Sequence, residues 1–167
     1  MQNGRVSLAV VCGNPKPKSR TLEAALFVAE RLCGAPPDVV LDLVELGPSL
    51  LVWGDPRVSE AVEAVRRCGV AIFASPTYKG TYTGLLKLFL DQFPSDALAS
   101  TTAFPVMLGA ALGHAMAPDL LLKPVLVELG ASCPTRGLYL LETDYLSEAV
   151  IEPWVARAKP HILPREP

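Results

Sequence analysis

Short apolar runs of strand length alternate with longer amphipathic runs along the whole chain, and this alternation restricts the possible folds more than any other feature. The run at residues 70–75 is apolar at nearly every position, which is typical of a central strand buried on both faces of a parallel sheet. Further strands are expected at residues 6–12, 39–43 and 103–108 and within 132–141. Because crossovers between parallel strands are right-handed, this pattern predicts an α/β fold with helices on both faces of the sheet.

The amphipathic runs carry apolar residues at helical spacing and end at glycine or proline. Helices are expected over residues 20–32, 58–68, 83–93, 118–129 and 147–159, and residues 46–57 are expected to be irregular. Five strands in this arrangement fit the order 2-1-3-4-5 of a three-layer, doubly wound parallel sheet. With no internal repeat and no long linker, residues 1–167 are expected to form a single domain.

Composition and charge exclude several classes of protein. The formal net charge of −2 argues against a nucleic-acid-binding surface and against adhesion to anionic membranes. No apolar run approaches the roughly 20 residues that span a bilayer, and the first residues lack the apolar core of a signal peptide. The four cysteines form no CxxC pair, so neither a zinc site nor a disulfide framework is expected. These features predict a cytoplasmic protein with no metal, nucleic-acid or membrane partner.

Three unusual loops follow the first, third and fourth expected strands, at residues 13–19, 76–82 and 109–114. In the order 2-1-3-4-5 the chain reverses direction between the first and third strands, and ligands bind at the carboxyl ends of the strands there. We therefore expect the three loops to converge on one binding site.

The first loop joins a buried strand to a helix N-terminus, which is a ready site for an anion. It carries Lys16 and Lys18, and the helix that follows begins with Ser19, Arg20 and Thr21. No Walker spacing is present. Because Pro15 and Pro17 lack an N–H, a phosphate would be held by the remaining amides, those of Asn14, Lys16, Lys18, Ser19, Arg20 and Thr21. The alternative is a solvated basic turn in which Ser19 only caps the helix.

The second and third loops could hold a flat ring. Pro76 fixes the direction of the chain after the central strand, Gly80 allows close approach of the backbone, and Tyr78 could pack on an aromatic ligand. The third loop is rich in small residues and ends at His114, which we interpret as a contact to the ring edge rather than an acid or base. The alternative for the second loop is a plain turn with Thr83 as the next N-cap.

These segments resemble the flavodoxin-like NAD(P)H-dependent FMN reductase family. Residues 13–21 resemble its ribityl-phosphate loop, and residues 75–87 with Asp91 resemble its Pro-x-Tyr isoalloxazine loop and the helix that follows. Residues 109–114 and 122–126 are similar to the third loop and helix of the branch that supplies reduced flavin to sulfonate monooxygenases. The resemblance covers about the first 140 residues.

The resemblance implies that FMN is the cofactor and NAD(P)H the hydride donor, with electrons passing to a flavin-using monooxygenase or a small acceptor. No side chain need act as acid or base. The implied FMN contacts are Asn14, Lys16, Ser19, Arg20 and Thr21 around the phosphate, Pro76, Thr77, Tyr78, Lys79 and Gly80 along the ring, and Gly109, Ala110, Gly113 and His114 on its pyrimidine side.

One departure concerns residues 118–129, because Leu120 stands where some members of the branch carry an inserted tyrosine that disturbs the helix. An ordinary helix and a more permanently held flavin are therefore expected. This helix and the one at 83–93 are apolar around most of their circumference, which requires burial on two sides. We expect a homodimer or homotetramer formed through them, in agreement with the family.

Three other functions fit parts of the pattern. Cys12 followed by Lys18-Ser19 resembles the Cys-x5-Arg-Ser loop of low-molecular-weight tyrosine phosphatases, but lysine lacks the bidentate grip of arginine on phosphate. A flavodoxin-type electron carrier or flavin sensor would bind FMN without turning over NAD(P)H. A quinone, azo or chromate reductase would use the same pocket with a different acceptor.

Overall fold

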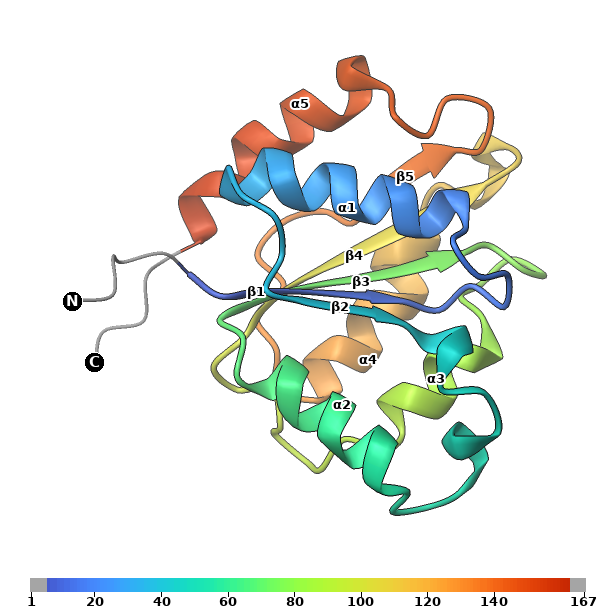
Figure 1. Ribbon diagram of the computed structural model, residues 1–167. Coiled ribbons are helices and arrows are strands. Elements are labelled where there is room, and N and C mark those ends of the chain that lie inside the picture. The colour runs from blue at the N-terminus through green and yellow to red at the C-terminus, as the bar shows by residue number, and fades with distance from the viewer. Residues whose placement is uncertain (1–5, 163–167) are drawn as a thin grey trace.

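The computed structural model describes residues 6–162, which form a parallel sheet between two layers of helices (Figure 1). The strand order is β2-β1-β3-β4-β5, which confirms the predicted doubly wound α/β fold. The strands are β1 (Leu8–Cys12), β2 (Val39–Asp42), β3 (Val70–Pro76), β4 (Thr102–Gly109) and β5 (Leu138–Leu141). Because all pairs are parallel, the carboxyl ends of the strands meet at one edge of the sheet.

Helices cover both faces of the sheet (Figure 1). They are α1 (Arg20–Cys33) and α5 (Glu148–Ala158) on the first face, and α2 (Pro56–Arg66), α3 (Gly84–Leu90) and α4 (Lys123–Glu128) on the second. In β1, Leu8 and Val10 pack toward α1 and α5, and Ala9 and Val11 pack toward the opposite layer. Burial on both faces explains the nearly unbroken apolar runs of β1 and β3. Within the described residues, no helix is both long and apolar enough to cross a membrane.

The segment expected to be irregular, residues 46–57, is partly helical, and that expectation is wrong in two respects. It contains the 3-10 helix η2 (Gly47–Leu51), which follows the 3-10 helix η1 (Leu43–Glu45). Helix α2 begins at Pro56, two residues earlier than expected. Proline is favoured at a first helical position because its missing N–H would have no partner there, and Asp55 caps the helix by accepting from Arg57 N at 2.9 Å.

The expectation of an ordinary helix over residues 118–129 is also wrong, because the segment begins as the π-helix η4 (Pro118–Leu122) and continues as α4. The N–H of Lys123 donates to the carbonyl of Pro118, five residues back. Pro124, the second residue of α4, has no N–H, so one backbone carbonyl of this segment lacks a helical donor whether the turn is α or π. The π-helix is present with leucine at position 120.

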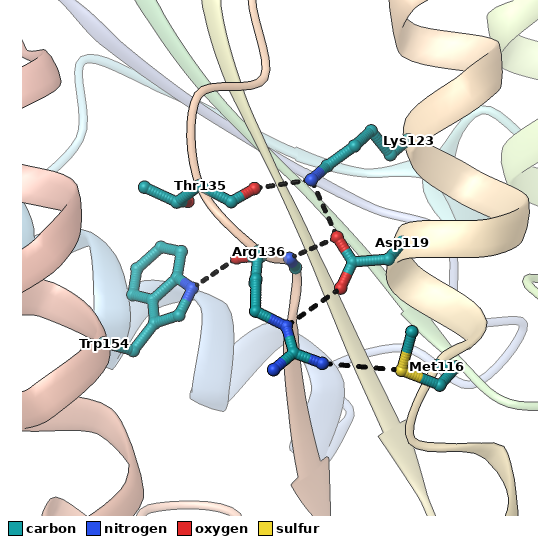
Figure 2. Close-up of polar contacts among 7 residues, drawn as sticks. Met116, Asp119, Lys123, Thr135, Arg136 and Trp154 are labelled. Atoms are coloured by element: carbon teal, nitrogen blue, oxygen red, sulfur yellow. Dashed lines mark hydrogen bonds and ion pairs between the residues drawn. The ribbon is translucent and has the colours of Figure 1, made fainter.

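Asp119 ties the π-helix to the segment that leads into β5, as Figure 2 shows. Its Oδ1 accepts from Gly137 N at 2.9 Å and lies 2.7 Å from Lys123 Nζ. Lys123 Nζ also donates to the carbonyl of Thr135 at 2.6 Å, and the carbonyl of Arg136 accepts from Trp154 Nε1 at 2.8 Å. The network joins η4, the 135–137 segment and α5.

Replacing Asp119 with alanine is expected to lower the free energy of unfolding by about 1–2 kcal/mol, because the Gly137 N–H loses its acceptor and the Lys123 ammonium loses its ion-pair partner. Urea denaturation measures the change. Asp144→Ala is the matched control, since Asp144 is an exposed aspartate and its replacement should change stability by less than about 0.5 kcal/mol. Equal stability of the two variants would contradict a stabilising role for the Asp119 network.

Candidate functional site

A cavity of about 270 Å³ opens at the carboxyl edge of the sheet, and residues from separate parts of the chain line it. The lining residues are Asn14, Lys16, Ser19, Arg20, Thr21, Pro76, Tyr78, Leu108 and Glu142. The first loop, the second loop and the ends of β4 and β5 thus meet around one space. Seven of these nine residues are among those expected from the sequence.

The first loop presents the N-terminus of α1 to this cavity. Ser19 is buried, and its Oγ accepts from Leu22 N at 3.3 Å, which makes it the N-cap of α1. Asn14 Nδ2 donates to Thr21 Oγ1 at 3.0 Å and holds the loop against the helix. The amides of Arg20 and Thr21 belong to the first helical turn, where no intrahelical carbonyl can accept from them. With Lys16 and Arg20 at the rim, the arrangement suits an anion.

The amides of Lys16 and Lys18 are already bonded within the protein, which corrects the expectation that they hold a phosphate. Lys16 N donates to Asn14 Oδ1 at 2.9 Å, and Lys18 N donates to Asp42 Oδ2 at 3.0 Å. The first loop therefore offers fewer free backbone donors to an anion than the sequence suggested, and those that remain include the first amides of α1.

The second loop is a tight turn between β3 and α3. Tyr78 and Thr81 exchange backbone hydrogen bonds of 2.9 and 3.3 Å, and between them Lys79 and Gly80 adopt φ values of +53° and +84°. This turn leaves the side chain of Tyr78 half exposed beside the cavity. Thr83 caps α3, accepting from Leu86 N, and its hydroxyl donates to the carbonyl of Gly13. That bond fixes the second loop to the first.

The third loop lies against the second. Thr77 N donates to the carbonyl of Leu108 at 2.7 Å, and a Cβ placed on Gly80 would stand 3.6 Å from His114 Cε1. Tyr139 Oη donates to the carbonyl of Ala111 at 2.8 Å and so holds the third loop from β5. Burial raises the pKa of the Tyr139 phenol. Ala110, Gly113 and His114 are exposed on this loop.

Four residues of the site escaped the sequence analysis: Asp42, Leu108, Tyr139 and Glu142. Asp42, Leu108 and Glu142 lie at or directly beyond the carboxyl ends of strands, where ligands bind in such sheets. The same rule that selected the three loops could have found these three. Tyr139 lies within β5 and had no such signal.

The thiol of Cys12 has the wrong environment for a phosphatase nucleophile. Cys12 is the last residue of β1 and is fully buried. Desolvation by this burial raises the pKa of Cys12 to about 11, whereas a nucleophilic cysteine needs a lowered pKa. The structure therefore disfavours the phosphatase interpretation.

We expect Cys12 to resist alkylation by iodoacetamide at pH 8 in the folded protein, because only about one thiol in a thousand is ionised three units below its pKa. Mass spectrometry after peptide digestion measures the modification at each cysteine. Denaturant should restore ordinary reactivity. Rapid modification of Cys12 in the folded protein would reopen the phosphatase interpretation.

The fold and the site together define a flavodoxin-like α/β protein whose cavity lies between the N-terminus of α1 and a turn that carries a half-exposed tyrosine. The model of the family "NADPH-dependent FMN reductase" matches residues 6–145, and the chain belongs to this family. It is therefore a flavoprotein oxidoreductase of the FMN reductase class, a family that uses FMN and NAD(P)H.

Named relatives and a solved structure agree. The chain is 30% identical to an FMN reductase (NADPH) of Escherichia coli strain K12 over 77% of this chain and 70% of the relative. It is 28% identical to an NADH-dependent FMN reductase of Pseudomonas fluorescens strain Pf0-1 over 84% of this chain and 80% of the relative. The structure of an apo NADH:FMN oxidoreductase superposes with a TM-score of 0.84 at 29% identity, covering 97% of this chain and 92% of that one.

Proposed function

We propose that this chain binds FMN with its phosphate at the N-terminus of α1 and its ring along residues 76–80, and reduces it with NAD(P)H. The observation that carries the proposal is the single cavity that joins Arg20 and Thr21 to Pro76 and Tyr78. An anion site beside a turn with an exposed tyrosine matches a ligand that is charged at one end and flat at the other.

The residues present fit FMN. Lys16 and Arg20 would neutralise the phosphate, and the hydroxyls of Ser19 and Thr21 with the first amides of α1 would hydrogen-bond it. Gly80 has no Cβ, so the backbone of the second loop and the side chain of His114 can both lie near the edge of a ring. Gly109, Ala110 and Gly113, which were also expected at the ring from the sequence, are not among the residues that line this cavity. When bound, FMN supplies the redox chemistry by accepting a hydride from NAD(P)H.

In this reaction the protein's role is to hold the flavin ring and its phosphate in position. Tyr139 and Thr83 hold the loops by hydrogen bonds to Ala111 and Gly13, so the ring wall and the phosphate site keep a fixed separation. His114 is exposed and would serve as a contact. We propose that no side chain acts as acid or base.

The electron acceptor is proposed from the resemblance to reductases that serve sulfonate monooxygenases: a flavin-using monooxygenase, or a small molecule that fits over the ring. The relatives include both an NADPH-dependent and an NADH-dependent FMN reductase, so either donor is consistent with the proposal. A cytoplasmic location stays a prediction drawn from the sequence.

Anaerobic mixing of the FMN-loaded protein with NADPH or NADH tests the activity. The proposal expects bleaching of the flavin absorption band within seconds, at a rate that depends on the donor. A stable oxidised spectrum with both donors would instead identify an electron carrier or flavin sensor. Gel filtration of the loaded protein, followed by its absorption spectrum, reports separately whether FMN is retained.

We also propose a homodimer or homotetramer, supported by the apolar surface of η4 and α4. Leu120 is 64% exposed and Val127 is 53% exposed. Helix α3 offers less apolar surface than the sequence suggested, because Leu86, Phe89 and Leu90 are buried within the chain and Leu85 and Leu88 pack against the same core. Light scattering at micromolar concentration should give at least the mass of a dimer, and a monomer would contradict the proposal.

A further inference from the structure

Asp42 is a buried carboxylate behind the first loop. It is the last residue of β2 and lies in register with Cys12, the last residue of β1, directly before the loop begins. Only 8% of the residue is exposed. Its Oδ2 accepts from Lys18 N at 3.0 Å, and its Oδ1 is buried with no hydrogen-bond partner among the described residues.

The contact to Lys18 shapes the loop. Lys18 adopts a φ of +49°, in the left-handed region that non-glycine residues rarely occupy. Its amide points to Asp42, so it is lost to any ligand on the other side of the loop. Asp42 thus anchors the loop and also removes one backbone donor from the anion site.

The charge of Asp42 is not balanced by an ion pair. Among residues 6–162, no lysine or arginine forms an ion pair with it. Glu45, whose charge acts on Asp42, is also negative. The neighbouring Cys12 is a neutral thiol. Burial raises the pKa of Asp42, whereas the hydrogen bond from Lys18 N opposes that rise by favouring the ionised carboxylate. A proton on Oδ1 would be a buried donor without a partner among the described residues.

We propose that Asp42 opposes the binding of phosphate on the first loop and thereby lowers the affinity for FMN. FMN then exchanges with the solution instead of staying permanently bound. This inference rests on the proposed placement of the FMN phosphate at the start of α1. Lys16 and Arg20 attract the phosphate from the cavity side, and Asp42 repels it through the loop. The affinity for FMN is the difference between these two effects, whereas the flavin ring does not sense Asp42.

The variant Asp42→Asn tests the proposal, because asparagine keeps the shape of the side chain and an acceptor for Lys18 N but removes the charge. Dissociation constants for FMN and for riboflavin, which lacks the phosphate, are measured by quenching of flavin fluorescence. Removal of a like charge separated from the phosphate by one loop should tighten FMN binding about tenfold. FMN should also dissociate more slowly, and riboflavin affinity should not change.

Glu45→Gln is the matched control, since Glu45 is exposed and three residues further along the chain; it should change FMN affinity less than about twofold, because solvent screens exposed charges. Asp42→Ser is a second neutral variant with the same expected direction, in case Asp42→Asn folds poorly.

Unchanged or weaker FMN binding in the folded neutral variants would overturn the inference and leave Asp42 as an anchor of the loop. An equal change for FMN and riboflavin would also overturn it, because the effect would then act on the shape of the pocket. A wild-type protein that binds both flavins equally would overturn the proposed placement of the phosphate, and the inference with it.

Discussion

Replacement of Arg20 by alanine is expected to weaken FMN binding by about 10- to 100-fold while the affinity for riboflavin stays nearly unchanged. Arg20 is the first residue of α1, and its side chain lines the cavity. A charge-assisted hydrogen bond to a phosphate contributes about 1.5–3 kcal/mol, which corresponds to that range of affinity. Fluorescence titration with the two flavins measures both constants on the same protein.

Arg20→Lys should give an intermediate loss, because lysine keeps the charge but not the planar pair of donors. Arg157→Ala serves as the matched control: Arg157 is an exposed arginine of α5 and does not line the cavity. Loss of riboflavin binding in Arg20→Ala would indicate that the loop itself had changed. Unaltered FMN binding would place the phosphate elsewhere.

The sheet could be predicted from sequence because a strand that is buried on both faces appears as a short, nearly continuous run of apolar residues. The run at Val70–Pro76 and the glycines and prolines that end each helix are local signals, and the strand order then follows from the rules of parallel crossovers. The start of α2 at Pro56 was missed because proline was interpreted as a breaker, although at a first helical position it favours a helix.

The π-helix shows the limit of an argument from one position. Leucine at 120 suggested a regular helix, but the segment is a π-helix, and Asp119 within it accepts a hydrogen bond from Gly137 N. That bond joins residues 18 positions apart and has no local pattern. The expectation of a permanently held flavin was drawn from the expected ordinary helix, so it no longer has that support. The proposed effect of Asp42 favours exchange of FMN instead.

The sequence predicted which loops form the site, but it did not predict which backbone N–H groups of the first loop are free to bind an anion. Three loops at the carboxyl edge follow from strand order. The bonds that occupy the amides of Lys16 and Lys18 depend on the orientation of Asn14 and on Asp42, which is 24 residues from Lys18 in sequence. Such pairings are tertiary, so the sequence indicated an anion site without indicating which amides form it.

Gly109→Ala is expected to lower the free energy of unfolding by about 3 kcal/mol, which is the upper part of the usual range for overpacking. Gly109 ends β4 opposite β5, and the phenol of Tyr139 lies over it. A Cβ at this position would stand well inside contact distance of Tyr139 Oη, 2.8 Å from Cζ and 3.3 Å from Thr77 Oγ1. The phenol would have to move, which breaks its bond to the carbonyl of Ala111.

A double-mutant cycle with Tyr139→Leu separates this cause from a general effect of alanine. Tyr139→Leu removes the phenol, so adding Gly109→Ala to it should reduce stability by no more than about 1 kcal/mol, which means a coupling of about 2 kcal/mol between the two sites. Gly113→Ala is the matched control for stability, since nothing lies within 4 Å of a Cβ there. Chemical denaturation measures all four proteins of the cycle. Additive losses would show that the phenol does not restrict position 109, and that β5 does not hold the third loop through Tyr139.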